Sequence, residues 1–148
     1  MTSDSDLDNI DIVLSEWRQG DCVVGEQWFL HRFSPEHPLT KLAAEIASEG
    51  IDIAETQEIG LVVLSQTCDI VRECRKRPFV EVAPLVQVDD QTLKVIQCGH
   101  MPRFAFVPGV ARDNLVADLD RVMTVEKALV AGWSRVRGCD SEAAVDSF

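Results

Sequence analysis

Short apolar runs separated by turn residues are the feature that most constrains the fold of this chain. The strongest run, at residues 61–64, follows a glycine and predicts a strand buried on both faces. Comparable runs lie at residues 28–33, 79–86, 93–96, 104–107 and 115–119, with prolines and glycines between them. Many short strands predict an α+β domain whose small antiparallel sheet is strongly bent or closed into a barrel, with peripheral helices.

Helical spacing is confined to a few segments. Apolar residues predict an inserted helix near residues 39–49, and Gly50 suits its left-handed end. Thr124 is a good N-cap for a helix over residues 125–133, and a second C-terminal helix is expected over 141–148. That last segment is short, which is consistent with a natural chain that continues beyond Phe148. Residues 1–9 lack apolar periodicity and predict a disordered acidic tail, which leaves residues 10–148 as a single domain.

The charge of the chain is concentrated in its first part. Residues 1–60 carry 13 acidic and 3 basic side chains, whereas residues 61–148 carry 12 acidic and 11 basic ones. The acidic part could dock a basic protein partner, although a solvated surface explains the same charge. No run approaches the roughly 20 apolar residues of a membrane span, and the acidic start is unlike a secretory signal. We therefore expect a cytoplasmic protein without a membrane partner.

A polar cluster of residues 65–69, Ser-Gln-Thr-Cys-Asp, follows the apolar run at 61–64 and is the densest candidate for chemistry. Cys68 is the candidate nucleophile, with Asp69 and His100 as candidate catalytic partners, since a reactive thiol needs a base or cation that lowers its pKa. The structural alternative is that Cys68 is a small buried apolar residue, that Asp69 caps the following turn, and that Ser65 and Thr67 satisfy backbone groups at the strand end.

The five cysteines are odd in number and irregular in spacing, so we expect free thiols rather than a disulfide framework. Zinc prefers four thiolate or imidazole ligands. The candidate zinc ligands are Cys68, Cys74, Cys98 and His100. No other cofactor is expected. The spacing contains no Cys-x-x-Cys pair, which makes zinc the less favoured hypothesis.

The only basic concentration lies at residues 72–77. Arginine forks match phosphate oxygens and lysine adds a point charge, so this run predicts contacts with the phosphates of RNA or DNA. The alternative is a solvated loop whose charges pair with neighbouring carboxylates. The candidate nucleic-acid-binding residues are Arg72, Arg75, Lys76 and Arg77.

The order of several segments resembles the small SH3-like barrel of the MazF and PemK toxins, which are endoribonucleases of toxin-antitoxin systems. The likeness spans most of residues 19–133. Its first two pieces are Gln19-Gly20-Asp21-Cys22-Val23 and Leu61-Val62-Val63-Leu64-Ser65. Its third is Val80-Glu81-Val82-Ala83-Pro84-Leu85. The last is residues 114–125, which resemble the closing strand pair before a helix.

The positions of the family's catalytic residues are occupied differently here. Its arginine before the second strand corresponds to Glu58-Ile59-Gly60, and its hydroxyl residue after the proline corresponds to Leu85-Val86-Gln87. In another register, Arg77-Pro78 would stand for the arginine-proline step of the family. The resemblance thus implies a nucleic-acid-associated or regulatory barrel of a bacterial conflict system, such as toxin-antitoxin or phage defence, rather than a standard ribonuclease. It also allows a homodimer.

Overall fold

The computed structural model describes residues 1–139, so the helix expected over 141–148 lies outside the described residues. Helix α1 (Asp4–Leu14) occupies most of the segment for which a disordered tail was expected, and that prediction is wrong. A capping box closes the start of α1, because Ser3 accepts from the backbone N–H of Asp6 while the Asp6 side chain accepts from that of Ser3. Leu14 is buried at the other end, so long-range packing stabilises the helix.

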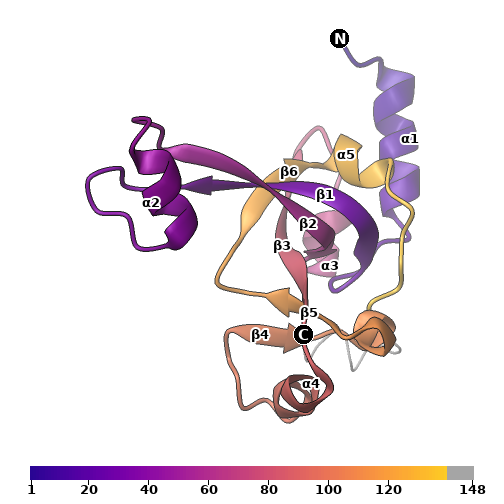
Figure 1. Ribbon diagram of the computed structural model, residues 1–148. Helices are drawn as coiled ribbons and strands as arrows, with labels where there is room; N and C mark the ends of the chain where they lie inside the picture. Colours follow the sequence, from indigo (N-terminus) through magenta and orange to yellow (C-terminus); the bar gives the residue numbers. More distant parts are fainter. Residues whose placement is uncertain (140–148) are drawn as a thin grey trace.

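A long antiparallel hairpin follows α1. Strand β1 (Cys22–Arg32) pairs with β2 (Ile53–Val63), and the expected inserted helix forms between them as α2 (Lys41–Ala47). Thr40 caps α2 by accepting from the backbone N–H of Ala43, and Gly50 has the expected left-handed conformation, with φ of 72°. The outer part of this hairpin projects from the body of the protein with α2 at its end (Figure 1).

Strand β3 (Phe79–Gln87) is the centre of the sheet. It pairs with β2 on one side, and on the other with β6 (Met123–Glu126) and then β5 (Leu115–Asp118). Between its β6 and β5 pairings, Ala83 and Pro84 have no partner on that second side. Pro84 suits this interruption of the pairing, because proline has no N–H to donate to a ladder.

The segment between β3 and β5 differs from the sequence prediction. Residues 93–96 were expected to be a strand, but they belong to helix α4 (Asp90–Gln97), which Asp89 caps through a hydrogen bond from the N–H of Thr92. Residues 93 and 95 are apolar in alternation, as in a strand, while 93 and 96 share a helix face, so the short run suits either structure and the cap favours the helix. Strand β4 (Phe104–Phe106) and the 3-10 helix η1 (Pro108–Asp113) complete this part.

The helix expected from Thr124 starts later than predicted. Thr124 lies inside β6, and α5 (Lys127–Ala131) begins only where the pairing with β3 ends. A further short helix, α3 (Thr67–Ile70), follows β2. Among residues 1–139, no helix is long and apolar enough to cross a membrane.

The expected α+β class is confirmed: residues 1–139 form six strands in one antiparallel sheet of order β1-β2-β3-β5-β4, with β6 beside β3. Within these described residues the sheet is not closed, so the barrel is not confirmed. Its central strands are buried on both faces, as expected for residues 61–64: Leu61 and Val63 enter one core cluster and Val62 enters another. The first cluster packs under α1 and α5 with Trp17, and the second under η1.

Candidate functional site

The basic loop, residues 72–77, connects α3 to β3. Its backbone is held in place by the buried side chain of Lys127. The Lys127 side chain is 1% exposed, and its ammonium donates to the carbonyl oxygens of Asp69 at 2.8 Å and Arg72 at 2.7 Å. The backbone N–H of Lys127 also donates to the carbonyl of Pro78. One residue of α5 therefore holds both ends of the loop.

Burial lowers the pKa of Lys127 below its usual value, although the nearby carboxylates of Asp11 and Asp69 oppose the shift. The two carbonyl hydrogen bonds offset part of the cost of removing the ammonium from water. Sequence reasoning missed this residue. A lysine among the apolar residues of 127–131 was the available signal, but a lysine on a short helix is ordinarily solvated.

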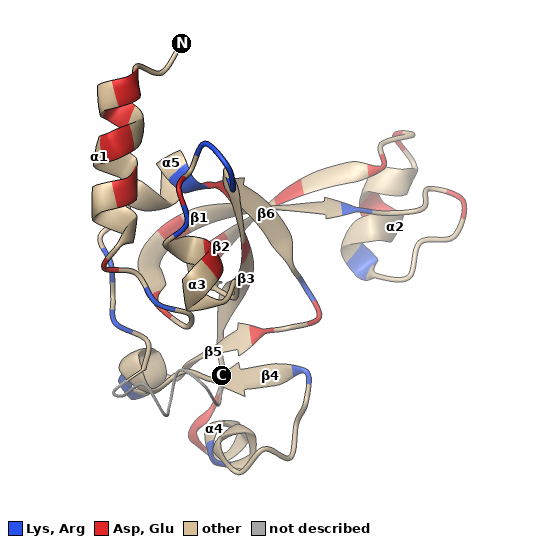
Figure 2. Ribbon diagram, turned by 180° about the vertical axis from the view of Figure 1, so that it is seen from behind, with Lys and Arg blue, Asp and Glu red and all other residues tan. Residues whose placement is uncertain are grey.

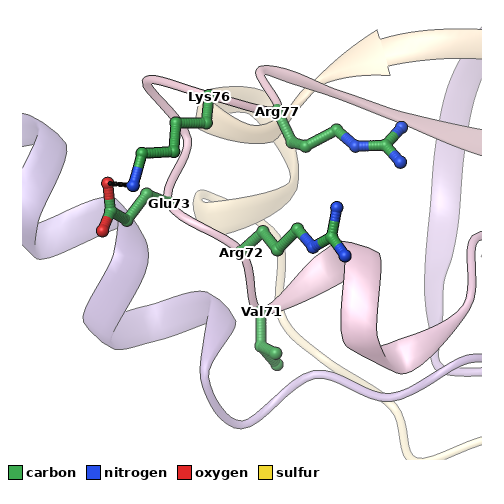
Figure 3. Close-up of a pocket in the computed structure, with 5 residues that line it drawn as sticks. All are labelled: Val71, Arg72, Glu73, Lys76 and Arg77. Carbon is green, nitrogen blue, oxygen red and sulfur yellow. Dashed lines mark ion pairs between the residues drawn. The ribbon is translucent and has the colours of Figure 1, made fainter.

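Arg72 and Arg77 approach each other above α3. Their guanidinium groups project to the same side of the loop (Figure 3), and both form ion pairs with Oδ1 of Asp69, at 3.8 Å from Arg72 and 3.1 Å from Arg77. Their side chains are 59% and 53% exposed. Because two arginines share one carboxylate, this trio keeps one net positive charge that faces solvent.

An open pocket of about 540 Å³ adjoins the trio and is lined by Val71, Arg72, Glu73, Lys76 and Arg77. Arg77 also lines a second, more polar pocket of about 490 Å³, together with Asp69, Gln66 and Glu81. Arg77 thus stands between two depressions, which gives an extended ligand room on both sides of its guanidinium group.

The other two predicted phosphate ligands are engaged elsewhere. Arg75 bonds the carboxylates of Asp4 and Asp8 on α1, each at 3.1 Å, and Lys76 pairs with Glu73 at 3.0 Å. The loop and the acidic α1 lie in the same part of the molecule (Figure 2). The backbone N–H of Cys74 donates to Asp11, a third α1 carboxylate. Arg75 therefore faces α1 and lines neither of these two pockets.

Two members of the polar cluster satisfy backbone groups. The Ser65 hydroxyl accepts from the N–H of Glu81 at 2.8 Å, and the Thr67 hydroxyl accepts from the N–H of Gln19 at 3.1 Å. This part of the structural alternative is confirmed. The expected burial of Cys68 is wrong, because Cys68 is exposed, with its thiol 3.7 Å from the side-chain oxygen of Gln66. The Asp69 carboxylate, expected to cap a turn, pairs with Arg72 and Arg77.

The structure does not bring His100 to Cys68 and Asp69. His100 is exposed in the turn after α4, whereas Cys68 and Asp69 lie on α3. Both ribbon views show α4 beside β4 and β5, and they show α3 in a different part of the molecule (Figures 1 and 2). Across residues 1–139, no hydrogen bond or ion pair joins His100 to either residue. The nucleophile hypothesis for Cys68 therefore stays a prediction without a histidine base.

The proposed zinc ligands are also distributed over different elements. Cys68 and Cys98 are exposed on α3 and after α4, whereas Cys74 is buried in the basic loop against α1. No group of three or more His, Cys, Asp or Glu side chains in the described part of the chain is arranged to hold a metal ion.

A second charged network, which the sequence did not reveal, surrounds Asp118. This carboxylate is 1% exposed and accepts from Arg103 at 3.0 and 3.1 Å and from Arg121 at 2.9 Å. Arg121 continues to Glu58 at 2.7 Å, and its guanidinium group lies over the ring of Phe29. Burial raises the pKa of Asp118, but the arginine hydrogen bonds outweigh it and hold the pKa below its usual value. The network ties β5 to β2.

None of the protein-family models, curated proteins or solved structures compared with this chain matches it. The resemblance to the MazF and PemK toxins thus stays a prediction from the sequence.

Proposed function

We propose that this protein binds the phosphate backbone of RNA or DNA through Arg72 and Arg77. The observation that carries the proposal is the pair of exposed guanidinium groups above a single shared carboxylate, at the edge of two pockets. Two arginines on one side of a loop can together bind a phosphate, each donating two N–H groups to its oxygens.

The existing ion pairs do not prevent such binding. An exposed ion pair contributes only about 0–1 kcal/mol, so an incoming phosphate can replace Asp69 as the partner of either arginine at small cost. Lys127 favours the same outcome, because it fixes the backbone of the loop at Asp69 and Arg72 before a ligand arrives. The proposal centres the phosphate contacts on Arg72 and Arg77 because their guanidinium groups lie on one side of the loop, whereas Lys76 points to the other side, toward Glu73 (Figure 3).

The test is binding of dye-labelled single-stranded RNA and DNA of mixed sequence, followed by fluorescence anisotropy at several salt concentrations. For the wild-type protein we expect binding whose affinity falls as salt rises. For Arg72→Ala/Arg77→Ala we expect an affinity about ten-fold or more lower, with a weaker dependence of affinity on salt concentration. The matched control is Arg32→Ala/Arg112→Ala, which removes the same charge from distant sites.

If the control variant binds nucleic acid as weakly as Arg72→Ala/Arg77→Ala, only the net charge of the protein determines binding. If the wild-type protein does not bind at about 20–50 mM salt, the proposal is excluded. A role in a bacterial conflict system is a further proposal that rests on the sequence resemblance alone. Its test is whether expression of the protein changes bacterial growth or phage sensitivity, and whether the arginine variant loses that effect.

A further inference from the structure

The projecting part of the hairpin, residues 24–59, has one covered face and one bare face. Directly opposed residues of β1 and β2 point to the same face, and exposure alternates along residues 27–32 of β1 and 53–59 of β2. Phe29 is buried, and His31 and Thr56 on the same face are half-buried and hydrogen-bonded to each other at 2.8 Å. Trp28 and Leu30 lie on the opposite, solvent-facing side.

The bare face is apolar to an unusual degree for a solvated strand pair. Trp28 is 55% exposed, Leu30 52% and Ile53 48%, and Ile59 continues the row toward the body. The other tryptophans behave differently, since Trp17 is buried and Trp133 packs against it with ring centroids 6.2 Å apart. A contiguous exposed apolar surface on a small domain marks an interaction site more often than an isolated exposed residue does.

Carboxylates lie among these apolar side chains. Glu55 is directly opposite Leu30, and Glu26 lies at the irregularity of β1 that separates Val24 from Gln27. Within residues 1–139, neither glutamate has an ion-pair partner. The whole projecting part carries seven acidic and two basic side chains. Arg32 also lies on this face, opposite Ile53, but it is paired with Asp52 at 2.8 Å. A cation that approaches Glu26 or Glu55 therefore meets unpaired negative charge.

A pocket lies where the bare face meets the body. Its volume is about 430 Å³, and its lining includes Val24, Ile59 and Glu26. Gly25 at its rim has φ of 131°, a conformation that side-chain-bearing residues rarely adopt. The lining also includes Glu58, which is paired with Arg121. The pocket therefore places two apolar side chains beside the carboxylate of Glu26, within the reach of a single lysine or arginine side chain whose aliphatic stem also contacts them.

We propose that the bare face, defined by Trp28, Leu30, Ile53 and Ile59 with Glu26 and Glu55, binds a basic amphipathic segment of a partner protein. Apolar side chains of the segment pack on the row, and its lysine or arginine groups pair with the glutamates. A cation placed over the exposed ring of Trp28 gains a further attraction from the ring electrons. This interaction is independent of the phosphate site on the basic loop.

Charge argues against two other occupants. A second copy of the chain would bring Glu26 and Glu55 against the same or other carboxylates of a molecule with net charge −11. The last nine residues of the chain, 140–148, contain three acidic residues and no basic one. A basic partner is the occupant whose charge complements this face.

The test uses a dye-labelled eight-residue peptide of alternating lysine and leucine, with binding followed by anisotropy and by the emission of Trp28. Two comparison peptides alternate lysine with serine and glutamate with leucine. We expect the lysine-leucine peptide alone to bind well and to shift the tryptophan emission to shorter wavelength. Trp28→Ser/Leu30→Ser should weaken binding at least ten-fold, and Glu26→Gln/Glu55→Gln several-fold.

Matched controls separate this surface from general stickiness. Ile12→Ser/Leu129→Ser removes two equally exposed apolar side chains elsewhere, and Glu16→Gln/Asp113→Asn removes two charges elsewhere. Both controls should bind as the wild type does. Equal loss in the controls, or equal binding of the lysine-serine peptide, would overturn the proposal. So would concentration-dependent dimerisation in sedimentation that Trp28→Ser abolishes, because the occupant would then be a second copy.

Discussion

The ammonium of Lys127 lies 2.8 Å from the carbonyl oxygen of Asp69, the residue whose carboxylate both candidate phosphate-binding arginines share. A single buried side chain therefore determines where the backbone of that carboxylate sits. The stability of the fold and the geometry of the candidate site are linked through this contact.

Replacement of Lys127 by methionine tests the link. Methionine has a similar length and suits an apolar site, but it leaves the carbonyls of Asp69 and Arg72 without their donor, at about 1–3 kcal/mol for each unsatisfied group. Relief of the buried charge offsets part of this cost. We expect the free energy of unfolding, measured with urea, to fall by about 1–3 kcal/mol, and RNA binding to weaken. Lys94→Met on exposed α4 is the control and should change neither.

Asp69→Asn separates phosphate binding from a catalytic role for the same residue. If Arg72 and Arg77 bind phosphate, loss of the competing carboxylate should strengthen RNA binding by about five-fold at low salt, equivalent to about 1 kcal/mol. Asp113→Asn provides the same charge change at a distance. A decrease in affinity for Asp69→Asn alone would contradict the proposed role of Asp69 as the displaceable counter-ion.

Asp118 should make the fold sensitive to acid. Its folded pKa lies below the ordinary value of 3.8, so the unfolded chain binds the proton more readily. The stabilisation is complete above about pH 3.8 and is lost as the pH falls through the folded pKa. In acid titrations followed by circular dichroism, Asp118→Asn should be less stable at pH 7 and less pH-dependent between pH 5 and 2. An unchanged acid transition would show that other carboxylates determine it.

Thiol reactivity should divide the cysteines by exposure. Cys68 and Cys98 are exposed, whereas Cys22, Cys74 and Cys139 are buried, and burial raises the pKa of Cys22 far above its usual value. Mass spectrometry after brief labelling in native buffer should find modification at the two exposed residues only. Fast modification of Cys68 below pH 7, with Cys98 as the internal reference, would favour the nucleophile hypothesis.

Several elements were predictable because their signals are local. The run at residues 61–64 and the helix near 39–49 are encoded by apolar spacing, by Thr40 as a cap and by Gly50 as a left-handed end, and both formed as expected. The strand predicted at 93–96 was wrong because a short apolar run suits two structures, and the cap at Asp89 favours the helix. The polar cluster at residues 65–69 and the basic run at residues 72–77 could be recognised from the sequence because their members are contiguous along the chain.

Local sequence patterns were sufficient to predict the α+β class, most strand positions and which residues could carry charge or chemistry, because these properties depend on neighbours along the chain. Tertiary structure alone decided that Arg75 pairs with α1 while Arg72 and Arg77 face solvent. It also separated His100 from Cys68, buried Lys127 beneath the loop and left Trp28 bare. Each of these outcomes depends on contacts between residues far apart in sequence, whose free energy no local pattern encodes.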